Sequence, residues 1–330
     1  MIRYSRRTRL ITFSLLMLMV VSMLFGCTRG GQQKPLPEDR PDQTKVKHDK
    51  KYKEEPTITL YVNETKEKKK VKLEEYLTAV VAAEMEPTWP TEALAAQAIL
   101  ARTFTLENIE AGRVKKLYGT DASTSVEEFQ AYDPTRVNDK VKQAVERTRG
   151  EVVTHKGKYI KAWFHACDGG KSATAKEGLA YTKTPTPYIK VVEDGCMDIT
   201  TPENKSWTVK FSKAEVREAV RKFVGKDPGD FQSVTISEKG PSGRAMTVKL
   251  GESSISGPAL RLALGSDKVR SMLLTDFRLE GGQVIFKGQG FGHGVGMCQW
   301  GANDFAKKGK SPEEIVKYYF KDVDVVKLWN

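Results

Sequence analysis

The sequence has few cysteines and only one long apolar stretch, and both shortages exclude classes of protein. Four cysteines among 330 residues are too few for a small fold built on disulfides or for an iron–sulfur protein. Residues 10–25 form an uncharged, mostly apolar stretch, shorter than the roughly 20 residues of a membrane-spanning helix. With 39% hydrophobic and 29% charged residues, the chain is neither a multi-span membrane protein nor fully disordered. Its length allows one large domain or two ordinary ones.

The amino terminus has the features of an export signal. A positively charged segment contains Arg3, Arg6, Arg7 and Arg9. The apolar residues 10–25 follow and end in Leu24-Phe25-Gly26-Cys27, which resembles the lipobox of bacterial lipoproteins. We therefore predict that residues 1–26 are a signal peptide with lipidation at Cys27, or an uncleaved anchor helix, because Phe25 fits the lipobox poorly. Either alternative places the rest of the chain on the outer face of the cytoplasmic membrane.

The chain is basic, and part of its charge belongs to that signal. It has 54 Lys and Arg against 42 Asp and Glu, a formal net charge of +12. Removing residues 1–26 removes four arginines and no acid, which leaves 50 basic against 42 acidic residues and a net charge of +8. A basic protein attracts anionic partners such as nucleic acid, membrane surfaces or acidic cell-wall polymers. The export signal argues against nucleic acid.

A polar linker precedes the folded region. Residues 28–56 contain only Leu36, Val46 and Tyr52 as sizeable apolar side chains. Such a segment cannot bury enough surface to offset the entropy lost on ordering, so we expect residues 27–56 to be a disordered linker. Residues 57–330 are then expected to form the catalytic domain.

Strand and helix patterns in the folded region do not alternate regularly. Strands are expected at 57–62, in a hairpin over 151–164 and in a hairpin over 233–250, and helices at 72–86, 91–109, 258–264 and after the capping box that begins at Ser311. This order predicts an α+β fold, with helices packed on antiparallel sheet. It leaves open two lobes with a cleft between them.

The first helix places a carboxylate on its apolar face. Its apolar stripe contains Leu73, Tyr76, Leu77, Val80 and Val81. Glu84 falls near the centre of that stripe, in the last turn before Pro87. Burial of a carboxylate raises its pKa, and a raised pKa suits a general acid. Two other interpretations remain open: the stripe ends before Glu84, or Arg102 pairs with Glu84 structurally.

Two further segments contain candidate site residues. In the Ala-rich second helix, Gln97 and Arg102 either line a site or face solvent. Glycine occupies every second position from 288 to 296, so an extended segment would have one bare face that lets a ligand or another backbone approach closely. The other face would present His293 among apolar neighbours. This spacing is neither a dinucleotide fingerprint nor a P-loop. The patch from Trp163 to Ser172 runs into a Gly-Gly turn, a common place for a site.

Several of these segments together resemble one family. The segments 80–85 (Val-Val-Ala-Ala-Glu-Met) and 92–104 are similar to the amino-terminal signature of the stage II sporulation protein D (SpoIID) family. The segments 165–170, 269–273, 292–302 (Gly-His-Gly-Val-Gly-Met-Cys-Gln-Trp-Gly-Ala) and 318–319 resemble later blocks of that family, in the same order. The resemblance covers nearly all of residues 57–330.

The resemblance implies a lytic transglycosylase that acts in sporulation engulfment. It would cleave the β-1,4 bond between N-acetylmuramic acid and N-acetylglucosamine in glycan strands without stem peptides, giving 1,6-anhydro products. Glu84 matches the catalytic residue. The implied substrate-binding or supporting residues are Gln97, Arg102, Gln130, Tyr132, His165, Ser172, His293 and Gln299. Implied partners are peptidoglycan, a SpoIIP-like amidase and a SpoIIM-like membrane anchor. The alternative is a non-enzymatic enhancer of a cell-wall amidase, because relatives with this domain modulate amidases.

The sequence departs from the family pattern at its cysteines. Some members carry a Cys/His zinc cluster in the segment that corresponds to 118–132, which here has neither residue type, so we predict no cofactor and no metal. Cys167 and Cys298 replace residues that are commonly Ser or Thr, and Cys196 is additional. Outside the cytoplasm Cys167 and Cys196 can form a disulfide; the alternatives are three buried thiols or, less favoured, a metal site with His165 and His293.

Overall fold

The computed structural model describes residues 52–126 and 128–330. The predicted signal or anchor, Cys27 and most of the predicted linker therefore lie outside the described residues. Residues 52–56, placed in the linker by sequence, are packed on the fold. The ring of Tyr52 contacts that of Trp329 edge-on, with centroids 5.7 Å apart, and Glu55 forms an ion pair with Arg149. These contacts order the chain before residue 57.

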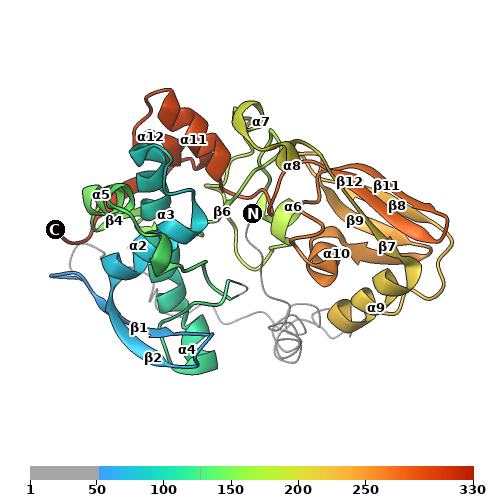
Figure 1. Cartoon of the computed structure of the whole chain (residues 1–330), viewed down its shortest axis with the longest axis horizontal. Coiled ribbons are helices and arrows are strands. Elements are labelled where there is room, and N and C mark those ends of the chain that lie inside the picture. Colours follow the sequence, from blue (N-terminus) through green and yellow to red (C-terminus); the bar gives the residue numbers. More distant parts are fainter. Residues whose placement is uncertain (1–51, 127) are drawn as a thin grey trace, which may run out of the picture.

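Two hydrophobic cores organise the described residues. The first contains buried side chains from residues 58–196 and from 297–329, and the second contains buried side chains from 207–286. In Figure 1 the elements of the first core occupy one side of the molecule and those of the second core the other. Two cores agree with the two lobes that the sequence left open. No described helix has the length and apolar character to span a membrane.

The elements of the first side include both ends of the described chain. Its helices are α2 (Leu73–Glu84), α3 (Thr91–Ala111), α4 (Arg113–Tyr118), α5 (Asp139–Arg147), α11 (Gln299–Lys307), α12 (Pro312–Tyr319) and the 3-10 turn η2 (Pro134–Arg136). Its strands are β1 (Thr57–Tyr61), β2 (Lys68–Lys72), β3 (Ala122–Ser123), β4 (Glu151–His155), β5 (Lys158–Tyr159), β6 (Phe164–His165), β13 (Met297–Cys298) and β14 (Asp324–Lys327).

The second side is inserted between β6 and β13. It contains β7 (Trp207–Ser212), α9 (Lys213–Val224), β8 (Val234–Lys239), β9 (Ala245–Leu250), β10 (Ser253–Ser256), α10 (Gly257–Leu264), β11 (Leu274–Glu280) and β12 (Gln283–Gly288). Short helices lead into it: α6 (Ala175–Leu179), α7 (Cys196–Ile199) and α8 (Pro202–Lys205). Both inserted three-stranded sheets, β10-β9-β8 and β11-β12-β7, are antiparallel.

The sheets confirm the predicted α+β class. The first side adds an antiparallel sheet, β14-β4-β5, and a mixed sheet in which β1 pairs antiparallel with β2 and parallel with β3. The predicted hairpin over 151–164 is shorter than expected, because β5 ends at Tyr159. The following residues form β6, which pairs in parallel with β13 from the far end of the chain. That pairing brings the Trp163–Ser172 patch to the glycine-rich segment.

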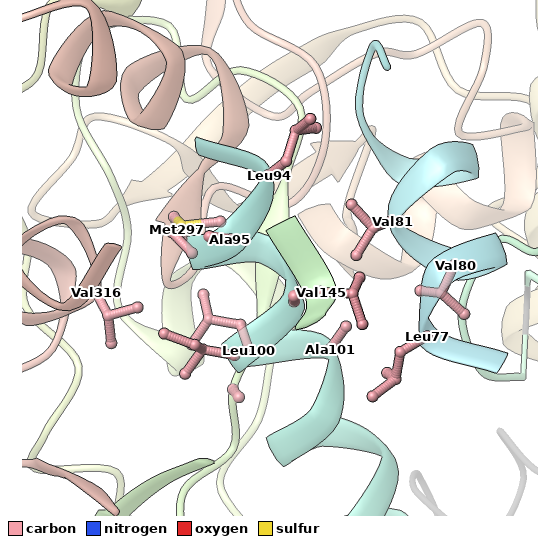
Figure 2. Close-up of a cluster of buried hydrophobic side chains, with 14 of the residues drawn as sticks. Leu77, Val80, Val81, Leu94, Ala95, Leu100, Ala101, Val145, Met297 and Val316 are labelled. Carbon is pink, nitrogen blue, oxygen red and sulfur yellow. The ribbon is translucent and has the colours of Figure 1, made fainter. Parts of the chain in front are cut away.

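The α2 and α3 helices form the centre of the first core. Leu77, Val80 and Val81 of α2 point toward Leu94 and Ala101 of α3, with Val145 of α5 between them (Figure 2). The small side chains of α3 allow neighbours to pack on several of its faces, as expected for a buried Ala-rich helix. Truncating a buried leucine to alanine in such a core costs about 2–5 kcal/mol. Rigid packing here fixes the carboxyl end of α2, where Glu84 lies.

Candidate active site

Glu84 is the last residue of α2, and its carboxylate is held from two directions. Its Oε1 accepts a hydrogen bond from the backbone N–H of Ala131 at 2.8 Å, and its Oε2 lies 3.5 Å from the side-chain Nε2 of Gln299. The residue is only partly exposed. Burial raises the pKa of Glu84 to about 7, because desolvation outweighs the lowering by these two donors. A carboxyl group with this pKa can donate and accept a proton near neutral pH.

Gln97 and Gln299 meet beside Glu84, although they lie 202 residues apart in sequence. The Nε2 of Gln299 also lies 3.4 Å from the Oε1 of Gln97, and both side chains are buried. Gln97 comes from α3, whereas Gln299 is the first residue of α11. The structure thus brings together Glu84, Gln97 and Gln299, which the sequence placed on three separate segments.

Gln130 and Tyr132 flank the residue that binds Glu84. Gln130 donates to the hydroxyl of Thr105 at 2.9 Å and lies 3.5 Å from the hydroxyl of Tyr76. The ring of Tyr132 stacks on Tyr76, with centroids 5.7 Å apart. These contacts hold the segment 130–132 so that the N–H of Ala131 faces Glu84. The Ala131 donor was missed from sequence because a backbone amide carries no residue signal.

Arg102 requires a correction, since it does not approach Glu84. Its guanidinium donates to both carboxylate oxygens of Glu74, at 3.0 and 2.6 Å, and to the carbonyl of Glu151 at 2.9 Å. Arg102 is completely buried and Glu74 nearly so. The interpretation that Arg102 lines the site or pairs with Glu84 is therefore wrong. Glu74 can be the partner because α2 is buried on more than one face.

His165, His293 and Ser172 form hydrogen bonds with backbone groups away from Glu84. Nδ1 of His165 lies 3.2 Å from the carbonyl of Val295, and Nδ1 of His293 accepts from the N–H of Val295 at 3.0 Å. The two rings lie 5.6 Å apart, and burial lowers the pKa of both, that of His293 to about 3. Both are therefore neutral near pH 7. The Ser172 hydroxyl contacts backbone groups of Lys190 and Val192. His165 and His293 thereby hold Val295 in the loop before β13, and Ser172 holds the segment 190–192.

The glycine-rich segment is not an extended strand with a bare face. Gly290, Gly292, Gly294 and Gly296 all have positive φ, between 75° and 110°. A Cβ at Gly292 would lie 2.8 Å from that of His165, and one at Gly296 would collide with the carbonyl of Trp163. The sequence left open whether a ligand or another backbone approaches these glycines. In the structure, other segments of the protein's own chain approach them. Glycine is needed for these left-handed conformations and contacts.

Two tryptophans next to this group were not singled out from sequence. Trp89 lies five residues after Glu84, and Trp300 immediately follows Gln299. Their rings meet edge-on with centroids 4.8 Å apart, and both are partly exposed. A partly exposed aromatic pair whose members follow Glu84 and Gln299 closely in sequence suits a ligand with an apolar ring face. Trp300 could have been identified from sequence, because it lies in the segment 292–302 that resembles the family. Trp89 lies between the similar segments 80–85 and 92–104 and gave no such signal.

The three described cysteines are free and buried. The Sγ atoms of Cys167 and Cys196 lie 3.5 Å apart, without a disulfide bond. Of the alternatives left open by sequence, the structure therefore has three buried thiols. Among the described residues, the group of potential metal-ligand side chains that contains Cys196 and Cys298 includes neither His165 nor His293.

Comparisons with known proteins identify two matching family models. Residues 61–155 match the SpoIID family, described as stage II sporulation protein, and residues 190–296 match a domain of unknown function, DUF8618. The chain is 34% identical over 255 residues to an uncharacterized protein of Brachyspira hyodysenteriae, covering 77% of this chain and 66% of that protein, just under two thirds.

Two relatives from Bacillus subtilis have functional names. The amidase enhancer is 25% identical over 292 residues, covering 74% of this chain and 39% of that protein. Stage II sporulation protein D is 30% identical over 292 residues, covering 82% of this chain and 78% of that protein. Because this second similarity extends over more than three quarters of both proteins, the chain belongs to the stage II sporulation protein D (SpoIID) family.

Proposed function

We propose that the chain is a peptidoglycan lytic transglycosylase of sporulation, with Glu84 as its general acid and base. Family membership supports the sporulation role. The observation that carries the chemistry is the buried Glu84 carboxyl, whose pKa is raised to about 7. Such a group is partly protonated at neutral pH, as an acid that later acts as a base must be.

The proposed reaction needs one proton carrier. Protonated Glu84 donates to the oxygen that joins N-acetylmuramic acid to N-acetylglucosamine, and the bond from C1 to that oxygen breaks. The C6 hydroxyl of the same muramic acid forms a new bond to C1, and its proton passes to the Glu84 carboxylate. The enzyme is thereby restored, and the product contains a 1,6-anhydro ring. Proximity of the internal hydroxyl replaces a bound water.

A single carboxylate distinguishes this reaction from ordinary glycoside hydrolysis, which uses two. Burial, Ala131 and Gln299 account for the shifted pKa of Glu84, and no second carboxylate of the described residues is among its causes. The partly exposed rings of Trp89 and Trp300 provide an apolar surface for a sugar ring.

The test is digestion of purified glycan strands whose stem peptides an amidase has removed. Mass spectrometry should find 1,6-anhydro ends, and E84Q should lower their rate of formation at least about 100-fold. E86Q is the matched control, because Glu86 lies two residues away but is exposed and paired with Arg136. Products that carry a reducing end instead of the anhydro ring would exclude the mechanism.

A non-enzymatic enhancer of a cell-wall amidase is the second candidate, favoured by the similarity to the amidase enhancer. It predicts that E84Q stimulates an added sporulation amidase as well as the unchanged protein does. A SpoIIP-like amidase and a SpoIIM-like anchor are the proposed partners in either case. Loss of stimulation together with loss of anhydro products in E84Q would favour the enzyme.

We also propose an extracytoplasmic location on the membrane, from the Arg-rich and apolar residues at the amino terminus. Intact-mass analysis of protein extracted from membranes distinguishes the two anchors. A lipid-modified Cys27 as first residue indicates a lipoprotein, whereas an amino terminus at Met1 indicates an uncleaved helix. Recovery of the unchanged chain from the cytosol would contradict both.

A further inference from the structure

A cluster of thiols and carboxylates lies outside the group around Glu84. Its members come from three segments: the loop after β6, the turn into α7, and the junction of β13 with α11. One potential ligand atom of each member lies within 4.8 Å of those of all the others; the members are Asp168, Asp194, Cys196 and Cys298. We propose that these four residues bind one zinc ion, which replaces the expectation of no metal drawn from the sequence.

The cluster holds two carboxylates, and the cation that acts on Asp168, Arg244, donates to its backbone carbonyl rather than to its carboxylate. Asp168 is completely buried, and its Oδ2 has no hydrogen-bond partner. Its Oδ1 accepts from the thiol of Cys196 at 3.0 Å. Within residues 52–126 and 128–330, no lysine or arginine forms an ion pair with Asp168 or Asp194. A buried carboxylate oxygen without a partner is costly, and a bound cation at this place removes that cost.

The surrounding groups orient the ligand atoms as they do in built metal sites. The sulfur of Cys298 accepts from the backbone N–H of Asp168 at 3.4 Å and from that of Gly301 at 3.3 Å. The carboxylate of Asp194 accepts from the hydroxyl of Tyr319 at 2.5 Å and from the N–H of Cys196 at 2.9 Å. Each carboxylate oxygen retains a lone pair for a metal.

The first turn of α11 is closely packed against the cluster at Gly301. A Cβ at Gly301 would collide with both the carboxylate of Asp194 and the hydroxyl of Tyr319. Glycine at 301 therefore lets the first turn of α11 lie directly against the cluster. Three of the four members are buried, and Asp194 is partly exposed, which provides a path for an ion to enter.

The ligand types indicate zinc. Two thiolates with two carboxylates suit a tetrahedral ion of intermediate softness, and calcium or magnesium would demand more oxygen atoms. Zinc–sulfur distances of about 2.3 Å and zinc–oxygen distances of about 2.1 Å place tetrahedral ligand atoms roughly 3.4–3.8 Å apart. The largest separation of 4.8 Å needs only small side-chain rotations to reach this range. Binding releases the thiol protons of Cys196 and Cys298 to solvent.

The cluster adjoins a residue of the candidate active site, so a bound ion would affect that site. Cys298 directly precedes Gln299, whose amide lies beside Glu84. A zinc ion would link the amino end of α11 to α7 and to the loop after β6. It would thereby fix the backbone from which Gln299 extends. Zinc is thus proposed as a structural ion, and Gln299 as the residue it positions.

The test is metal content of the purified full chain after dialysis against metal-free buffer. We expect about one zinc per chain, and at least about 100-fold weaker zinc binding in C196S and C298S. Loading with Co²⁺ should give visible bands of a tetrahedral ion and a near-ultraviolet thiolate-to-cobalt band, both lost in C298S. E193Q is the matched acid control, because Glu193 is exposed beside Asp194. C167S is the matched thiol control, because Cys167 contacts Cys196 but is not one of the four ligand residues.

Other results would overturn the proposal. Equal zinc in unchanged protein and in C298S means that the ion binds elsewhere, and zinc loss in C167S means a different ligand set. No zinc, together with two fewer alkylated thiols, means a Cys167–Cys196 disulfide. Because the cysteine variants can misfold, unchanged protein is also melted with Zn²⁺ and with EDTA. A melting temperature that does not differ between them contradicts a structural ion.

Discussion

At the scale of single residues, Glu84 is governed by a competition between burial and hydrogen bonding. Burial raises its pKa, and the donors Ala131 and Gln299 lower it, with a result of about 7. The proposed lytic reaction requires the protonated acid, so the rate should fall as pH rises through this value. Each donor therefore sets the pH range of activity as well as the geometry.

Removing one donor should shift this range. Q299A is expected to raise the pKa of Glu84 further and move the alkaline limb of kcat/KM on denuded glycan to higher pH, because the lost amide favoured the ionised form. Its maximal rate should also fall, since the carboxylate loses an orienting contact. The control is Q283A, on the exposed first residue of β12. An unchanged alkaline limb in Q299A would show that Gln299 does not act on Glu84.

Glu84 should also reduce stability at alkaline pH. Its pKa is about 7 folded against 4.5 for an unperturbed carboxyl, so the folded state binds the proton more tightly. Stability from this group is complete below about pH 4.5 and is lost as pH rises through 7. E84Q is therefore expected to increase the free energy of unfolding at pH 8 by about 1–3 kcal/mol and to change it little at pH 4.5. Urea unfolding at both pH values measures this, and equal effects at both would contradict it.

At the scale of elements, the buried ion pair of Glu74 and Arg102 joins several parts of the first core. It links α2 to α3 and, through the carbonyl of Glu151, to β4. The same Glu74 carboxylate accepts from the N–H of Gly150 and from the indole of Trp329, both at 3.1 Å. The carboxyl-terminal segment is thereby attached to the helix that carries Glu84.

Breaking this pair from one side should be costly. R102L is expected to lower the free energy of unfolding by about 3–5 kcal/mol, because it leaves the buried Glu74 carboxylate without its cation. The double variant E74M/R102L should lose less than either single change, since it leaves no buried charge. R113L, at an exposed ion pair, should change stability by less than about 1 kcal/mol. Urea unfolding of R102L, E74M, E74M/R102L and R113L tests this. A double variant less stable than R102L would contradict it.

The elements also show what the sequence can and cannot predict. Period and capping signals predicted α2, α3, α10 and α12 to within a few residues, because these signals are local. They also identified Glu84 as a carboxylate on an apolar face. The Glu74–Arg102 pair, the N–H of Ala131 and the parallel pairing of β6 with β13 depend on contacts between distant segments. The apolar stripe that the sequence assigned to α2 did not include Glu74, which is buried because this helix is covered on several sides.

At the scale of the whole molecule, one exposed strand concentrates positive charge. The strand β2 exposes Lys68, Lys69, Lys70 and Lys72. The ammonium of Lys69 lies 3.5 Å from the hydroxyl of Tyr132, next to the Ala131 that binds Glu84. Glycan strands without stem peptides carry a free lactyl carboxylate on each muramic acid. A basic strand leading from the candidate site would attract them.

This charge complementarity predicts that the KM for glycan depends on salt concentration. The dependence should come from the carboxylates of the substrate. Raising ionic strength from about 0.05 to 0.3 M should raise KM for denuded strands several-fold with little change in kcat, because screening weakens attraction between exposed charges. Strands whose lactyl carboxylates have been converted to amides should show almost no such effect. K69E should raise KM for the anionic strands, whereas K249E, an exposed lysine on β9 of the second side, is the matched control. Equal salt dependence on both substrates would mean that the basic surface binds another anion. The net charge of +8 outside residues 1–26 would then not serve to attract the carboxylates of the glycan.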